Sequence, residues 1–145
     1  PEYPIDASIQ LKVPLNIIAN DLHLRDTTDI DIQQNEDIEI EKFFLKIENG
    51  FPIDCNINMI LLDKNKDVLD TLFKNQSISS SFMQNNLVVE KSINILESTI
   101  HNSDEIKNVV FDIRFNTDDV NNHVSIYNDY TIDFLLSVKL KNRVN

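Results

Sequence analysis

Glycine and cysteine are nearly missing from this chain and tryptophan is absent, and the shortages of glycine and cysteine each exclude a class of site. The 145 residues include one glycine, one cysteine and no tryptophan. A single glycine cannot build the G-x-G-x-x-G loop or the P-loop that cradle phosphates. The lone cysteine, Cys55, cannot form an internal disulfide, and its place in an apolar alternation predicts a small buried residue rather than a reactive thiol.

Basic residues are also scarce, which disfavours nucleic acid and anionic membranes as partners. The chain has 13 lysines and arginines against 24 aspartates and glutamates, and its formal net charge is −11. Phosphate backbones are bound by a basic stripe. The one basic cluster, Lys139, Lys141 and Arg143, is too small to provide such a stripe. We therefore expect no nucleic-acid binding.

Long apolar runs and the features of a signal peptide are absent as well. No stretch approaches the roughly 18 apolar residues of a membrane-spanning helix. The first ten residues, PEYPIDASIQ, have neither the charged nor the apolar region of a signal peptide. We expect a fragment or mature chain, with residues 1–8 as a connector from an upstream region and residues 9–145 as a single domain.

Period-two alternation of apolar and polar residues dominates what is present. The clearest run is YTIDFLLSVKL at 130–140, and VVFDIRF at 109–115 and IQLKVPL at 9–15 repeat the pattern. Such alternation is typical of half-buried antiparallel strands. Because proline cannot donate to a ladder, Pro14 predicts an edge or an end of the early strand. The sequence predicts an all-β fold, an antiparallel, immunoglobulin-like β-sandwich of about 8 strands with at most one short helix.

Local breaks in the alternation predict a bulge and two hairpins. The apolar positions of residues 38–40 are out of phase with those of residues 43–47, which predicts a bulge near Glu41 and Lys42. The tight connections DKNK and QNN each separate two apolar runs, and their asparagines can adopt the left-handed backbone that hairpin turns need.

Residues 89–100 fit both a strand and a helical stripe. We predict extended structure to about residue 96, followed by a short helix with Ser103 as its N-cap.

The one glycine lies in IENGFPIDC, between two apolar runs. We interpret Asn49, Gly50 and Pro52 as a structural turn between strands. Gly50 is predicted to take a positive φ, while Pro52 fixes its own φ and keeps Phe51 extended.

Residues that could carry chemistry are few. His23, His101 and His123 lie far apart without metal-ligand spacing, so we interpret them as surface or loop residues. There is no G-x-S-x-G elbow for a nucleophile. We expect no catalytic activity and no cofactor. Tyr127 and Tyr130 are the best aromatic candidates for stacking on a sugar, and the alternative is that they pack at a strand end.

Two segments are candidates for calcium. DKNKDVLD has oxygen ligands at a spacing like that of an EF-hand, but Val68 takes the glycine position and Lys74 the glutamate position, so a polar hairpin is favoured. The second segment is the acidic stretch at 26–41, whose alternative interpretation is a solvated face. Its carboxylates that could converge from a loop are Asp26, Asp29 and Asp31.

Three segments resemble outer-membrane and cell-surface lipoproteins of Bacteroidota. These are VPLNIIANDLHLRDTTDIDI at 13–32, FFLKIENGFPIDCNINMILLDKNKDVLDTLF at 43–73 and VSIYNDYTIDFLLSVKLK at 124–141. The middle segment is also remotely similar to the sandwich domain of late-embryogenesis-abundant type 2 (water-stress) proteins, although the proline that follows Asn in that family is displaced here to Pro52.

The resemblance implies an extracytoplasmic interaction or scaffold domain on the periplasmic or cell-surface side of the outer membrane. It implies protein partners, a lipid anchor upstream of this chain, and no catalytic residues. It also makes Thr71, in the triplet DTL, a candidate for O-glycosylation.

Three functions remain open on the sequence. The first is a non-catalytic interaction or scaffold domain in an outer-membrane or surface assembly. The second is a carrier of a lipid or other apolar ligand between the sheets. The third is an enzyme or a surface module that binds a glycan or calcium through acidic loops.

Overall fold

The computed structural model describes residues 2–12, 22–30, 38–85, 87–100, 105–116, 126–127 and 129–143. Its strands are β1 (Glu2–Lys12), β2 (His23–Asp29), β3 (Ile38–Asn49), β4 (Cys55–Leu62), β5 (Val68–Ile78), β6 (Phe82–Gln84), β7 (Leu87–Glu90), β8 (Ser92–Thr99), β9 (Asn108–Phe115) and β10 (Thr131–Asn142). These residues contain no α-helix, and none of them forms a helix that could cross a membrane. The predicted all-β class is confirmed.

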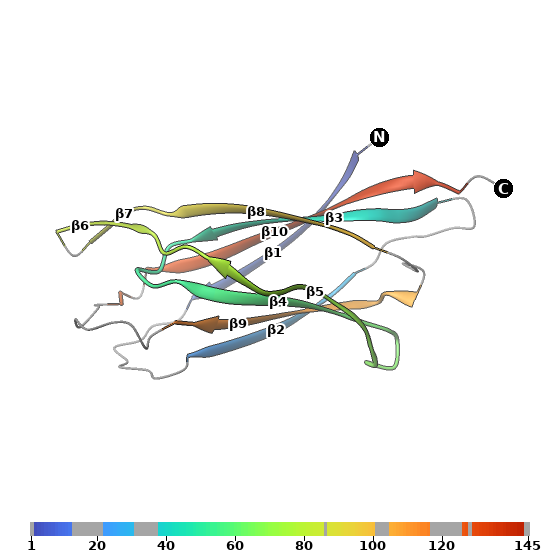
Figure 1. Ribbon diagram of the computed structural model, residues 1–145, viewed down its shortest axis with the longest axis horizontal. Coiled ribbons are helices and arrows are strands. Elements are labelled where there is room, and N and C mark those ends of the chain that lie inside the picture. Colours follow the sequence, from blue (N-terminus) through green and yellow to red (C-terminus); the bar gives the residue numbers. More distant parts are fainter. Residues whose placement is uncertain are drawn as a thin grey trace.

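Eight strands form two antiparallel sheets that lie face to face, as Figure 1 shows. The first sheet has the order β1-β10-β3-β8, the second has the order β2-β9-β4-β5, and β6 pairs with β7 in a separate ribbon. The pairs β3–β8 and β4–β9 correspond to the B–E and C–F pairs of the immunoglobulin fold. The strands that flank these pairs come from other parts of the chain than in the immunoglobulin fold. The last strand, β10, takes the place of the first immunoglobulin strand, A, and the early strand β2 takes the place of the last, G.

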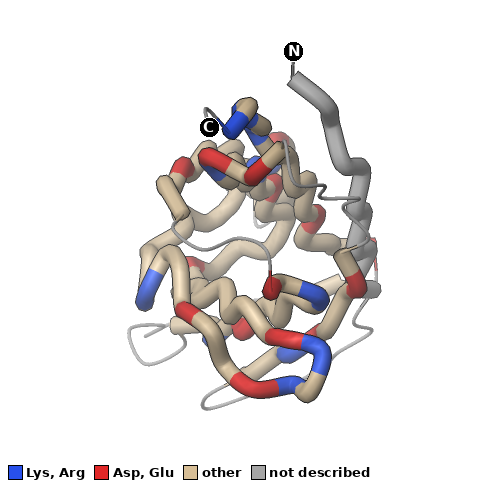
Figure 2. Tube along the Cα trace, turned by 90° about the vertical axis from the view of Figure 1, so that its right-hand side faces the viewer, with Lys and Arg blue, Asp and Glu red and all other residues tan. Residues whose placement is uncertain are grey.

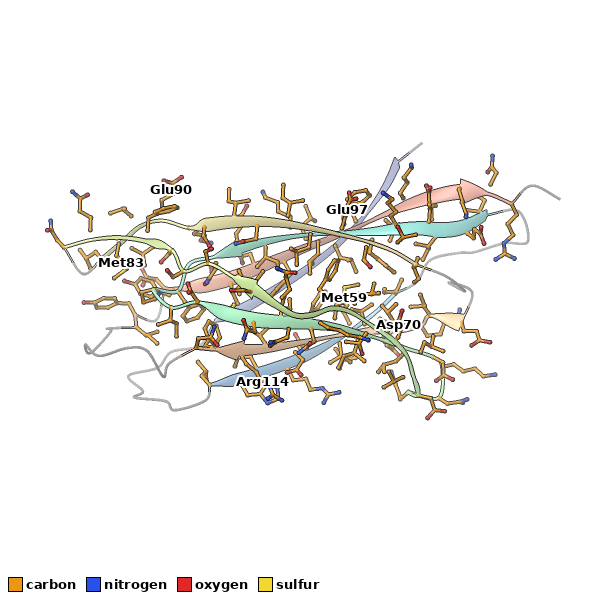
Figure 3. The ribbon with its side chains drawn as sticks, in the orientation of Figure 1. Met59, Asp70, Met83, Glu90, Glu97 and Arg114 are labelled. Atoms are coloured by element: carbon orange, nitrogen blue, oxygen red, sulfur yellow. The ribbon has the colours of Figure 1, made fainter. Side chains whose placement is uncertain are left out.

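The space between the sheets is filled by every second side chain of the central strands. Phe111 of β9 stacks on Phe134 of β10, with ring centroids 5.1 Å apart, and so joins the two sheets. Met59 of β4 is fully buried between them, as Figure 3 shows. Burial of one such side chain contributes about 1.5–3 kcal/mol. The core therefore determines which face of each strand is left for other functions.

The predicted bulge in β3 is confirmed. Lys139 of β10 lies opposite Lys42, whereas the next residue, Leu140, lies opposite Ile40. Glu41 is therefore the extra residue, and it changes the phase of the alternation so that both halves of β3 send apolar side chains inward.

A second and larger bulge lies in β5. Leu72 pairs with Met59, but the next paired residue along β5 is Gln76, opposite Ile57. Two residues between them, Phe73 and Asn75, have positive φ values of 52° and 50°. The N–H of Asn75 donates to the side-chain oxygen of Asn58 at 2.7 Å, which holds the bulge against β4.

Both predicted hairpins are confirmed, since β4 pairs with β5 and β6 with β7. In the second turn, Asn85 has a φ of 52°, as expected for an asparagine in place of glycine. In the first turn, the positive φ of 71° belongs to Lys66 rather than to Asn65, so that part of the prediction is wrong.

Gly50 lies at the corner predicted for it, but the predicted reason is wrong because its φ is not positive. Its N–H donates to the carbonyl oxygen of Thr131 at 2.8 Å. A Cβ at residue 50 would lie 2.7 Å from that same oxygen. Glycine is required here by the close approach of β10, not by its backbone conformation.

The buried side chain of Asn49 stabilises the same corner through hydrogen bonds. Its buried side-chain nitrogen donates to the carbonyl oxygens of Ile53 and Ser79, at 3.1 and 3.0 Å, and its side-chain oxygen accepts from the N–H of Phe51 at 2.9 Å. Pro52 lies half-buried in the bend that follows. The predicted structural turn is thus a hydrogen-bonded corner.

At the N-terminal end, β1 pairs with β10 at the edge of the first sheet, which confirms the prediction of an edge strand there. Residues 2–8, expected to be a connector, belong to this strand instead. In residues 89–100 the predicted extended structure is confirmed by β7 and β8. Pro14 and Ser103 lie outside the described residues.

Candidate functional site

The solvent face of the second sheet carries a contact between a histidine and a carboxylate. His23 of β2 is within hydrogen-bond contact of Asp112 of β9. Asp112 is nearly buried, whereas His23 is exposed. The strand register places Arg25 on one side of Asp112 and Asn58 on the other. The contact therefore attaches the edge strand β2 to its neighbour within a polar row.

A histidine–carboxylate pair activates a nucleophile only when that nucleophile lies within hydrogen-bond reach of the histidine. The cross-strand row through His23 continues with Arg114, Asn56 and Ser77. Figure 3 shows Arg114 on the side of β9 that faces away from the other sheet. Ser77 is three strands from His23, which is about 14 Å at the usual spacing between strands. Within this row of described residues, the contact of His23 with Asp112 therefore holds two neighbouring strands together.

A second polar contact at the other end of β9 uses one of the predicted calcium ligands. Asp29 of β2 accepts a hydrogen bond from the side-chain amide of Asn108. The side-chain oxygen of Asn108 in turn accepts from the amine of Lys66, at 2.5 Å. Asp29 is thus part of a link between β2, β9 and the β4–β5 hairpin.

The structure does not bring Asp26, another predicted calcium ligand, to Asp29. Asp26 lies three residues away on the same strand and therefore projects from the opposite face, where it accepts from the N–H of Thr27 at 2.7 Å. Asp31 lies outside the described residues. No group of three possible metal ligands occurs in the part of the chain that the structure describes.

The EF-hand-like segment is a hydrogen-bonded turn. One carboxylate oxygen of Asp63 accepts from the N–H groups of Asn65 and Asp67, at 2.7 and 2.8 Å. This arrangement is the usual way in which aspartate stabilises a tight turn. The carboxylate therefore faces the backbone of its own turn.

Cys55 is buried between the sheets. Desolvation raises the pKa of its thiol to about 12, and the neighbouring Asp54 adds to the rise. A thiol with such a pKa stays protonated at neutral pH and is a poor nucleophile. The remaining two histidines, His101 and His123, lie outside the described residues.

The two candidate tyrosines lie together just before β10. Tyr130 is buried edge-on against Phe51, with ring centroids 6.5 Å apart, and its hydroxyl accepts from the N–H of Val88 at 3.4 Å. Tyr127 packs edge-on against Tyr130 at 5.4 Å and is exposed. Tyr130 therefore connects the core to β7, and only Tyr127 offers a ring to solvent.

Thr71, the candidate for O-glycosylation, lies on the edge strand β5 opposite Ile60 of β4. Its side chain is half-buried, and its N–H donates to the side chain of Asp70 at 2.7 Å. The triplet DTL is therefore part of a regular strand segment, on the hairpin side of the β5 bulge.

The basic residues at the end of β10 are paired with acidic residues of β3. Lys139 contacts Glu41 at 3.1 Å and Lys141 contacts Glu39 at 3.0 Å. The hydrogen bond from Lys141 lowers the pKa of Glu39. Figure 2 shows blue and red segments next to one another at this end of the tube. The cluster is thus balanced locally rather than displayed as a basic stripe.

The most unusual surface lies on β7 and β8, where apolar side chains face solvent. Four residues at alternating positions form what we call the apolar stripe, and they are exposed by 51%, 60%, 60% and 72% respectively. They are Leu87, Val89, Ile93 and Ile95. Leu135, the residue that breaks the alternation of β10, is exposed in the same cross-strand row as Ile95, with Lys46 between them.

The apolar stripe was missed in the sequence because alternation reveals a period and not which face is buried. On β8 the phase is inverted: Ser92 is buried and donates to the carbonyl oxygen of Ser79 at 2.5 Å, while Ile93 and Ile95 point outward. Pairing of Ser92 with Asn49 fixes this register. A signal was nonetheless present, since polar Ser92 and Asn94 alternate with the two isoleucines.

Neither the protein-family models nor the curated proteins compared with this chain gave a match.

Proposed function

We propose that this chain is a non-catalytic β-sandwich domain that binds other proteins through the apolar stripe. We further propose that it acts as an accessory subunit of an outer-membrane or cell-surface assembly. That setting is supported by the resemblance of segments 13–32, 43–73 and 124–141 to extracytoplasmic lipoproteins of Bacteroidota.

The observation that carries the proposal is the outward phase of β7 and β8. Isolated apolar side chains are normal on a protein surface, whereas contiguous apolar patches mark interaction sites. Here the exposed positions alternate along β7 and along β8, two strands that are consecutive in the chain. Covering one such side chain contributes up to about 1.5–3 kcal/mol to binding. The sum over several neighbouring side chains can offset the entropic cost of association.

The rigidity of the strands beneath the apolar stripe supports the same function. β8 pairs with β3 over its whole length, and β3 pairs with β10 on its other side. The corner at Asn49 and the contact of Tyr130 with Val88 hold the β7 end. A surface presented on paired strands loses little conformational entropy when a partner binds.

The non-catalytic part of the proposal is supported by the polar contacts of the second sheet. His23 and Asp112 hold β2 to β9, and Asp29, Asn108 and Lys66 hold β2 to the β4–β5 hairpin. Each of these side chains has a structural partner in the described part of the chain.

The proposal is tested by capture of proteins from solubilised outer membranes on the immobilised chain. Wild type should retain a partner subunit, and Ile95→Asp should lose it because a carboxylate would be placed in the contact. Val68→Asp is the matched control, because Val68 is equally apolar and 63% exposed but lies on β5. Equal capture by the two variants, with unchanged unfolding in urea, would contradict a role for the apolar stripe.

A further inference from the structure

The edge strand β8 lacks most of the features that usually prevent a sheet edge from pairing, and Glu97 is its one charged residue. Natural edges carry proline, lysine, a bulge or an inward charge. β8 has eight residues, Ser92–Thr99, without proline, lysine or arginine. It pairs with β3 in continuous register, and among the described strands it has no neighbour on its other side. Its open edge can therefore accept another strand.

The residues around Asn94 are complementary to their own reverse. Ile93 and Ile95 lie one residue from Asn94, and Lys91 and Glu97 lie three residues from it. Two copies paired antiparallel about a two-fold axis at Asn94 would place Ile93 of each copy opposite Ile95 of the other. The same axis would place Lys91 of each copy opposite Glu97 of the other. Opposite charges and matched apolar residues are favourable cross-strand pairs.

The neighbouring registers do not have this complementarity. An axis at Ile93 would place Ile95 opposite Lys91, and an axis at Ile95 would place Ile93 opposite Glu97. Both of these registers put an apolar side chain against a charge. Only the axis at Asn94 matches apolar with apolar and positive with negative.

We propose that two copies of this chain pair antiparallel through β8, with the two-fold axis at Asn94, so that their first sheets join into one continuous eight-stranded sheet. This inference rests on the proposed function, because it makes the apolar stripe part of an interface. Pairing would bring Ile93 and Ile95 of both copies together on one outer face. The two stripes then form a single larger surface for the partner subunit.

Cross-linking tests the register. In Asn94→Cys the two new cysteines face each other across the axis, at a Cα distance of about 4.5–5.5 Å, which a disulfide can span. Oxidation should convert this variant into a covalent dimer. In the control Thr99→Cys the cysteines would lie about 34 Å apart, so it should stay monomeric on a non-reducing gel. The buried Cys55, with its raised pKa, is a poor competitor for oxidation.

Charge exchange tests the same register without a covalent bond. Lys91→Glu and Glu97→Lys should each weaken dimerisation about tenfold, because two favourable pairs become repulsive. An equimolar mixture of the two variants should recover the wild-type dimer, since every pair across the axis is again opposite in charge. Within one copy, Lys91 contacts Asp133 at 2.6 Å and Glu97 contacts Lys42 at 3.4 Å. Recovery in the mixture separates the pairing of the two copies from any effect on these contacts.

Sedimentation velocity measures the mass of the species in solution. The protein is held at roughly 100 μM, because a small interface is weak and forms a dimer only at high concentration. A species of twice the 16.8 kDa chain supports the pairing. A wild-type monomer, a cross-link in Thr99→Cys equal to that in Asn94→Cys, or a mixture that does not recover would overturn it. If the chain is monomeric while Ile95→Asp still abolishes capture of a partner, the proposed function stands and the self-pairing is rejected. If the wild-type chain is a dimer and Ile95→Asp captures as much partner as wild type, the self-pairing stands and the proposed function is rejected.

Discussion

β5 and β8 are the edge strands on one side of the sandwich, and they differ in backbone and in side chains (Figure 1). β5 is interrupted by the bulge that contains Phe73 and Asn75, both with positive φ, and it carries Asp70 and Lys74. β8 has a continuous register and shows Ile93 and Ile95 to solvent. A bulge, and lysine above all among charged residues, prevent further strand pairing at an edge. One edge of the protein is therefore closed to strands while its neighbour is open.

The difference lies in how regularly apolar residues are exposed. β5 also exposes Val68 and Leu69, which are adjacent in the chain, whereas Ile93 and Ile95 of β8 alternate on one face of a strand in continuous register. Both strands lie next to well-buried central strands, β4 and β3 respectively. The closed edge has two non-glycine residues, Phe73 and Asn75, in the left-handed conformation, which costs energy. An open edge with a regular apolar face is what a strand-mediated interface requires.

The largest expected effect tests whether both edges depend on one core. Phe111→Ala should lower the free energy of unfolding by about 3–5 kcal/mol, because Phe111 stacks on Phe134 and joins the two sheets. Urea unfolding measures the loss, and Phe82→Ala, at an exposed phenylalanine, is the control. Amide exchange should rise in β5 and β8 together. Protection retained in only one of them would show that the edges are held independently.

The next effect concerns the corner that holds β3, the neighbour of β8. Gly50→Val should lower the free energy of unfolding by about 1–3 kcal/mol, since the new side chain collides with the carbonyl of Thr131. Gln76→Val, which adds the same side chain at an exposed position of β5, should change it by less than about 0.5 kcal/mol. Equal unfolding midpoints in urea would show that β10 can move away from residue 50.

The closed edge can be strained further at Asn75. Asn75→Val should cost about 1–2 kcal/mol, because a β-branched residue is unfavourable at a φ of 50°. Asn75→Gly keeps the backbone conformation accessible and should leave the unfolding midpoint nearly unchanged. The pair of variants, compared by thermal and urea unfolding, measures how firmly the bulge is held. An Asn75→Val variant with the wild-type unfolding midpoint would mean that the bulge rearranges without a cost in stability.

The smallest effect on stability should come from closing β8 in the way that β5 is closed. Ile95→Lys places a charge on the open edge, where the side chain is 72% exposed, and should change the free energy of unfolding by less than about 0.5 kcal/mol. Self-association should nonetheless be lost, as measured by sedimentation velocity. A variant that remains dimeric would show that the two copies meet elsewhere than at β8.

Most of the fold follows from the sequence, because strand alternation and turn residues act locally. The bulge at Glu41 was predictable from a change of phase alone, and both hairpins were predictable from short polar connections between apolar runs. The bulge in β5 was not, because nothing local reveals that Phe73 and Asn75 take left-handed conformations. The side-chain oxygen of Asn58, on the neighbouring strand, holds that conformation.

The candidate site was less predictable, because it depends on which strands become neighbours. His23 and Asp112 are 89 residues apart in the chain and meet only because β2 pairs with β9. Asp26 and Asp29, close in sequence, are separated because successive positions on a strand face opposite sides. Sequence distance misleads in both cases.

By itself, the sequence determined the all-β class, the acidic surface, the position of the corner at Gly50 and the self-complementary residues around Asn94, since each depends on composition or local order. Only the tertiary structure decided why Gly50 is needed, where the edges lie and which face of β8 is exposed. The physical reason is that alternation defines two faces but does not choose between them. Burial of Ser92 against Ser79, and pairing of Ser92 with Asn49, make that choice and turn Ile93 and Ile95 to solvent.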